Sequence, residues 1–133
     1  MSGDGLWDGA EILDRYSREQ ALADGMLVDP GPAAREAGFR FPVALTAAVW
    51  ADCVAWDDAR ERAIQDERGR LWDVLWMTRL AIRRAPAGAD RVRVQLHRIP
   101  SGGLRAKLVT LEAVVGPGDR GEPVITIQQP GED

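Results

Sequence analysis

"GRLWDVLWMTRLAIRRAPAGADRVRVQLHRI", residues 69–99, contains two different hydrophobic periods. Apolar side chains recur at helical spacing over residues 69–84, whereas apolar and polar residues alternate strictly over 91–99. The segment 85–90 between them has the composition of a loop. The pattern therefore predicts a helix that is followed directly by a strand.

The predicted helix is apolar around nearly its whole circumference. At 100° per residue, one face, expected to contact a helical layer, carries Leu71, Val74, Leu75, Thr78, Ala81 and Ile82. The opposite face carries Trp72, Trp76, Arg79 and Arg83, which the i, i+4 and i+7 spacing brings within mutual reach. A helix that is apolar on both faces is usually covered on both. We expect the chain's own sheet to cover the tryptophan face, with another chain as the alternative.

The rest of the chain places helices before strands. Ser17 and Gln20 form a capping-box pattern, and Thr46 is expected to cap a helix over residues 47–63. After the strand at 91–99, two more strand-like runs lie at 104–115 and 124–130, joined by short glycine-rich turns that favour antiparallel pairing.

These elements predict an α+β fold in which an N-terminal helical layer packs on a C-terminal three-stranded antiparallel meander. Residues 1–9 are expected to form a disordered tail, and residues 10–133 a single domain.

Composition excludes several classes of site and location. One cysteine and one histidine can form neither an intramolecular disulfide nor a Cys/His zinc site, and we expect no metal and no cofactor. The acidic N-terminal segment lacks the basic and apolar regions of a signal peptide. No stretch approaches the roughly 20 apolar residues of a membrane span. We therefore expect a cytoplasmic protein without a membrane partner.

Charge is distributed unevenly along the chain. Residues 60–107 carry a formal charge of +7 and the remainder −11, for a net charge of −4. The basic part could face an anionic partner or pair with the acidic part of the same chain. Candidate nucleic-acid contacts are Arg91, Arg93, Arg105 and Lys107. Nucleic-acid binding is possible but not favoured, because the chain is acidic overall and has no aromatic residue after Trp76 to stack on bases.

No constellation predicts catalysis, so we assign no catalytic residue. Cys53 lies on an apolar helical arc, where cysteine behaves as a small buried hydrophobe, and His97 occupies a solvent-side position of its strand. The acidic cluster Asp57, Asp58, Glu61, Asp66 and Glu67 is interleaved with arginines, which is typical of a solvated helix face.

Four phrases carry a family resemblance: "YSREQALADGMLVD" (16–29), "AREAGFRFPVALTAAVW" (34–50), "GRLWDVLWMTRLAIRR" (69–84) and "GPGDRGEPVITIQQPGED" (116–133). Together they resemble a family of small bacterial proteins of unknown function that occur in plasmids and other mobile elements. The resemblance implies a free-standing bacterial protein and brings no activity or catalytic residues with it.

The leading hypothesis is a non-enzymatic binding protein that acts through a protein–protein surface, with a host defence system as the candidate target. Its binding residues would be Trp72, Trp76, Arg79 and Arg83, and its partner an unknown protein or a second copy of the chain. The alternatives are a nucleic-acid-associated accessory factor that uses the basic hairpin, and a small enzyme.

Overall fold

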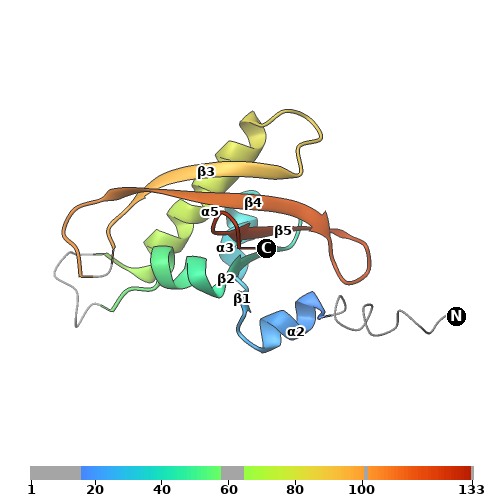
Figure 1. Cartoon of the computed structure of the whole chain (residues 1–133), viewed down its shortest axis with the longest axis horizontal. Coiled ribbons are helices and arrows are strands. Elements are labelled where there is room, and N and C mark those ends of the chain that lie inside the picture. The colour runs from blue at the N-terminus through green and yellow to red at the C-terminus, as the bar shows by residue number, and fades with distance from the viewer. Residues whose placement is uncertain (1–15, 58–64, 101, 133) are drawn as a thin grey trace, which may run out of the picture.

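Five strands form one mixed sheet in this computed structural model, which describes residues 16–57, 65–100 and 102–132. In spatial order they are β1 (Leu27–Val28), β2 (Val43–Thr46), β5 (Pro123–Gln128), β4 (Lys107–Pro117) and β3 (Arg91–Arg98). The neighbours β3, β4 and β5 pair antiparallel, β2 lies parallel to β5, and β1 lies antiparallel to β2 (Figure 1). The predicted meander is thus only part of the sheet, to which the N-terminal half of the chain adds two strands.

Strand β2 was not expected from the sequence. All four of its residues are buried, and the register places Val43 opposite Ile125 and Leu45 opposite Ile127. A continuous apolar run of this kind fits a strand covered on both faces. Such a short run cannot be distinguished from a buried helical turn by periodicity, which is why the pattern left it unassigned.

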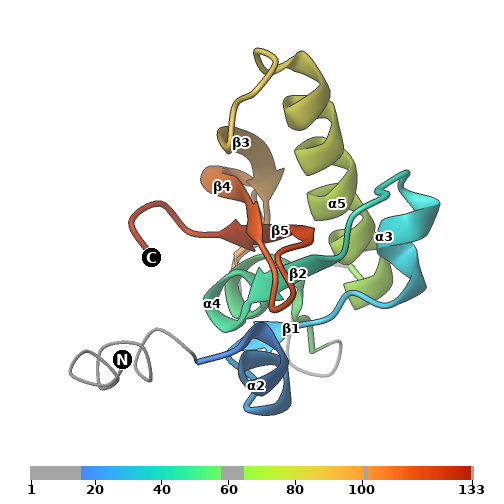
Figure 2. The same ribbon diagram turned by 90° about the vertical axis from the view of Figure 1, so that its right-hand side faces the viewer.

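The helices are α2 (Arg18–Ala23), α3 (Pro32–Glu36), α4 (Ala47–Val49), the π-helix η1 (Trp50–Val54) and α5 (Glu67–Arg84). Helices α5 and α3 lie on the same side of the sheet, whereas α2 lies beside β1 (Figure 2). The predicted packing of a helix on the meander is confirmed for α5, which contacts β3, but the N-terminal half is not a purely helical layer, because it also contains β1 and β2.

Two predicted helix starts are confirmed. The Ser17 hydroxyl accepts from Gln20 N at 2.9 Å, and Ser17 N donates to the Gln20 side chain at 3.1 Å, which completes the capping box. The Thr46 hydroxyl accepts from Val49 N at 3.2 Å. The helix that begins there widens into η1 and ends at Val54, so the expected continuation is wrong at residues 55–57. Residues 58–63 of that prediction, and the expected tail at 1–9, lie outside the described residues.

The core lies between α5 and the sheet. On α5 the predicted burial of one face is confirmed, since Leu71, Val74, Leu75 and Thr78 are buried and Ala81 and Ile82 are half-buried against them. The expectation that this face contacts a helical layer is only partly right, because α5 packs on β3 as well as on η1 and α3. On β3 the predicted alternation is also confirmed, because Val92, Val94 and Leu96 are buried while Arg91, Arg93, Gln95 and His97 are exposed. The polar residues of β3 thus line the face of the sheet opposite α5.

Candidate functional site

Helix α5 is the longest described helix, and its ends are well defined. The Asp66 carboxylate accepts from Gly69 N at 2.5 Å at the N-terminus. Arg83 and Arg84 occupy the last turn, where positive charge favours the helix dipole. The helix ends at Ala85, which is extended and precedes Pro86. This rigid element presents one face to the core and another to solvent.

The solvent face carries two stacked tryptophans. Trp72 and Trp76 are 38% and 39% exposed, and their rings lie nearly parallel at 14°, with centroids 5.8 Å apart. The expectation that the chain's own sheet covers them is wrong. The sheet packs on the opposite, core-facing side of α5, where residues such as Leu75 are fully buried. Because the chain has a single sheet among its described residues, no second layer is present to cover these indoles.

The two arginines predicted beside the tryptophans have different surroundings. Arg79 is half-buried, and its guanidinium lies over Gly38, close enough that a Cβ there would be 2.4 Å from Nε. Arg83 is exposed and, with Leu80 and Arg84, lines a shallow hollow of about 320 Å³. Of the predicted partner-binding set, Trp72, Trp76 and Arg83 are therefore accessible, whereas Arg79 is largely occupied by packing.

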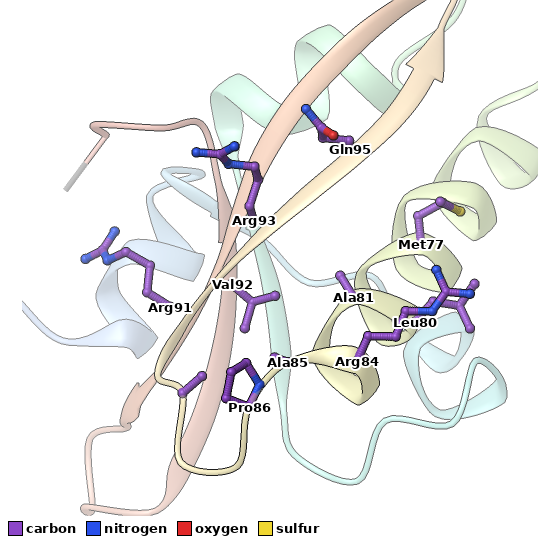
Figure 3. Close-up of a pocket in the computed structure, with 11 residues that line it drawn as sticks. Met77, Leu80, Ala81, Arg84, Ala85, Pro86, Arg91, Val92, Arg93 and Gln95 are labelled. Atoms are coloured by element: carbon purple, nitrogen blue, oxygen red, sulfur yellow. The ribbon is translucent and has the colours of Figure 1, made fainter.

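A groove separates α5 from β3. It has two adjoining parts, of about 520 and 400 Å³, which share Met77 and Gln95 as lining residues. In Figure 3, Met77, Leu80, Ala81 and Arg84 of α5 lie across from β3. Val92 points toward the helix, whereas Arg91 and Arg93 point to the other side of the strand. Trp76 lines the second part, so the groove continues into the tryptophan face.

The four basic residues proposed for nucleic-acid contact do not share one surface. Arg91 and Arg93 lie on the open face of β3, and Arg91 Nη1 forms an ion pair with Glu112 Oε1 at 2.7 Å. Lys107 has the strand parity of the buried Leu111, which assigns it to the helix-covered face. Arg105 lies in the loop before β4. The predicted basic hairpin is thus split and partly neutralised.

Two buried arginines were missed by the sequence reasoning. Arg70 is 2% and Arg98 6% exposed. The Arg70 guanidinium lies 4.6 Å from the Trp56 ring and donates to the Val54 and Ile99 carbonyls at 3.1 Å each. Strand parity could have identified Arg98, because it continues the buried series of alternate positions that includes Leu96.

The residues considered for catalysis or metal binding do not form a common site. Cys53 is fully buried in the core, and burial raises the pKa of its thiol, whereas His97 lies on the exposed face of β3. Of the acidic cluster, Asp66 caps α5, Glu67 accepts from Trp56 N at 3.3 Å, and Asp58 and Glu61 lie outside the described residues. Within the described ranges, no three histidine, cysteine or acidic side chains are close enough to share a metal ion.

None of the helices in the described part of the chain is both long and apolar enough to span a membrane.

The fold and its surface define a small α+β protein with one helix-covered sheet face and an exposed pair of tryptophans. The chain belongs to the family of unknown function DUF6573, whose model matches residues 4–133. Neither the curated proteins nor the solved structures that were compared with it include a match.

Proposed function

We propose that this chain is a non-enzymatic binding protein that acts through a protein–protein surface on α5. The exposed, stacked pair Trp72 and Trp76 carries the proposal. Tryptophan is strongly enriched among the residues that dominate binding energy in protein interfaces. An indole pair held on a rigid helix loses little conformational freedom on binding, which lowers the entropic cost of forming the interface.

The surroundings of the pair also fit an interface. Leu80 is half-buried beside the indoles, and Arg83 and Arg84 are exposed at its edge. An apolar centre with arginine at its border is the usual composition of a protein-binding patch. The resemblance to bacterial plasmid proteins supports a cytoplasmic setting and a partner from the host, such as a component of a defence system.

Two substitutions separate binding from folding. Leu75→Ala should cost about 2–5 kcal/mol of stability, as expected for a fully buried leucine. Trp76→Ala should cost less than this, because the indole is 39% exposed; it removes the stacking on Trp72, about 0.5–1.5 kcal/mol, and the packing of the covered part of the ring. Thermal melts of both variants measure this difference. An equally severe loss for Trp76→Ala would mean that the indole belongs to the fold.

The functional test compares the double variant Trp72→Ala, Trp76→Ala with wild type in affinity capture from the native host. Met26→Ala is the matched control, because Met26 is 59% exposed and lies next to β1, away from α5. We expect wild type and Met26→Ala to retain one stoichiometric protein after nuclease treatment, and the double variant to lose it. Equal capture by the double variant, or capture that nuclease abolishes, would overturn the proposal. Light scattering identifies the case in which the partner is a second copy.

A further inference from the structure

Strand β3 is an edge of the sheet. The carbonyl of Asp90 accepts from Val115 N at 2.8 Å, and this pair continues the β3–β4 register in which Arg91 lies opposite Val114. Hydrogen-bonded pairs alternate along antiparallel strands. The main-chain groups of Val92, Val94 and Leu96 are therefore directed to β4, and those of Arg93 and Gln95 to the outer edge. Among the described residues, no strand lies on that outer side.

The groove between α5 and β3 runs along this edge. Its first part is lined by Arg91, Arg93 and Gln95, and its second by Gln95, His97 and Arg98. On the helix side it is lined by Trp76, Met77, Leu80, Ala81 and Arg84. A sixth strand added to β3 would therefore place every second side chain beside the apolar residues of α5, and the others beside Arg93 on the open face.

Charge selects the chemistry of that strand. Arg84 and Arg93 are exposed beside the groove and form no ion pair within the described part of the chain. Two of the neighbouring carboxylates are engaged, because Glu112 pairs with Arg91 and Asp73 pairs with Arg98, each at 2.7 Å. A third, Asp90, is exposed immediately before β3. The edge is therefore complementary to an acidic strand.

We propose that the β3 edge binds an extended acidic segment of the partner protein by strand addition, with apolar and acidic residues alternating along that segment. The inference rests on the proposed function, since the groove adjoins the Trp76 side of the same surface. Main-chain hydrogen bonds along an edge give affinity in this mode, and the alternate side chains give specificity.

A second copy of the chain is a poorer occupant. Two β3 strands placed side by side would bring the exposed arginines of both chains, Arg91 and Arg93, onto one shared open face. Like charges on neighbouring strands destabilise the pairing, and charged residues are a common means of preventing edges from associating.

The test uses a fluorescent peptide of alternating glutamate and valine residues, as long as β3, with anisotropy as the readout. A peptide of the same composition with its glutamates in one block is the control for charge. N-methylation of alternate residues along one edge of the peptide removes its strand hydrogen bonds without changing its charge. We expect the alternating peptide to bind and the block peptide to bind at least about tenfold more weakly. Methylation of the peptide edge that pairs with β3 should abolish binding, whereas methylation of the other edge should not.

Protein variants locate the binding. Arg93→Glu should lower the affinity for the alternating peptide about tenfold or more, because a like charge would face the glutamates of the peptide. Arg120→Glu is the matched control, since Arg120 is exposed in the loop between β4 and β5 and should leave binding unchanged. Thermal melts establish that both variants fold.

Four results would overturn the inference: no peptide binding, no effect of methylation, a dimer of the chain that occupies the edge, or a DNA duplex that binds there in place of the peptide. If host-protein capture still depends on Trp72 and Trp76 but not on Arg93, this inference fails while the proposed function stands.

Discussion

The guanidinium of Arg98, at the end of β3, donates a hydrogen bond of 3.3 Å to the main-chain carbonyl of Cys53, 45 residues earlier. It also donates to the Arg70 carbonyl at 3.3 Å, and its Nη2 lies 2.7 Å from Asp73 Oδ2. The Arg70 guanidinium reaches the next carbonyl, that of Val54. The carbonyl end of a helix has no intrahelical partners, so these two arginines provide the missing donors for η1.

Substitution of Arg98 should therefore destabilise the whole fold. Arg98→Met removes this donor from the buried Cys53 carbonyl and should cost about 1–3 kcal/mol. Arg98→Lys should also be destabilising, because an ammonium cannot reproduce the planar set of donors. Chemical denaturation measures the loss, with Arg93→Met on the exposed face of the same strand as the control. A loss for Arg98→Met no larger than the control's would show that the buried guanidinium is not needed for stability.

Gly38→Ala should be destabilising for two separable reasons. Gly38 has a φ of +103°, and a Cβ there would lie 2.4 Å from Arg79 Nε. The control is Gly88→Ala, at a φ of +85° with no atom within 4 Å of the new Cβ. It should lower the stability only by the cost of placing a Cβ on left-handed backbone, about 1–2 kcal/mol.

Arg79→Ala separates the two causes at Gly38. In the Arg79→Ala background the cost of Gly38→Ala should fall toward that of the control, with a coupling energy of about 0.5–3 kcal/mol from a double-mutant cycle of thermal melts. Additive effects would show that the guanidinium moves aside without cost.

The sequence predicted elements with a clear period and missed those whose environment is set by distant residues. The faces of α5 and β3 followed from periodicity, as the burial of Leu75 and Val94 shows. The parallel pairing of β2 with β5 did not, because nothing local identifies the partner of a short apolar run. The last carbonyls of η1, which ends at Val54, accept from Arg70 and Arg98, which follow later in the chain.

The candidate surface was also predicted only in part. The pairing of Trp72 with Trp76 follows from their i, i+4 spacing, but their exposure depends on which face of α5 the sheet occupies. The groove beside β3 could not be predicted, because it depends on β3 being an edge strand, which is a property of the sheet order.

Asp119 should make the docking of α2 dependent on pH. Its carboxylate accepts from Arg18 N at 2.8 Å and from Glu19 N at 3.0 Å, and these two bonds hold the pKa of Asp119 below its usual value. Because the pKa of Asp119 is lower in the folded state, its carboxylate contributes fully to the free energy of unfolding above the unfolded pKa, about 3.9. This stabilisation disappears as the pH falls through the folded pKa.

Asp119→Ala should accordingly lower the Tm at neutral pH and leave it nearly unchanged in acid. Hydrogen exchange of the α2 amides, such as Ala21 N, which donates to the Ser17 carbonyl, should become faster in the variant at neutral pH. Asp90→Ala removes an exposed carboxylate outside these contacts and serves as the control. A Tm difference between Asp119→Ala and wild type that does not shrink below about pH 4 would exclude the carboxylate as its cause.

Cys53 should be chemically inert in the folded protein. Its side chain is fully buried, and desolvation, followed by the charge of Asp52, raises the pKa of the thiol. Since the thiolate is the reactive form, a thiol reagent should modify the folded chain only as fast as the chain opens, and immediately in denaturant. In a Cys53→Ala background, Leu104→Cys places a thiol at a position that is 55% exposed and should react at once. Rapid labelling of the native protein, or loss of partner capture in a folded Cys53→Ser variant, would instead point to a functional thiol.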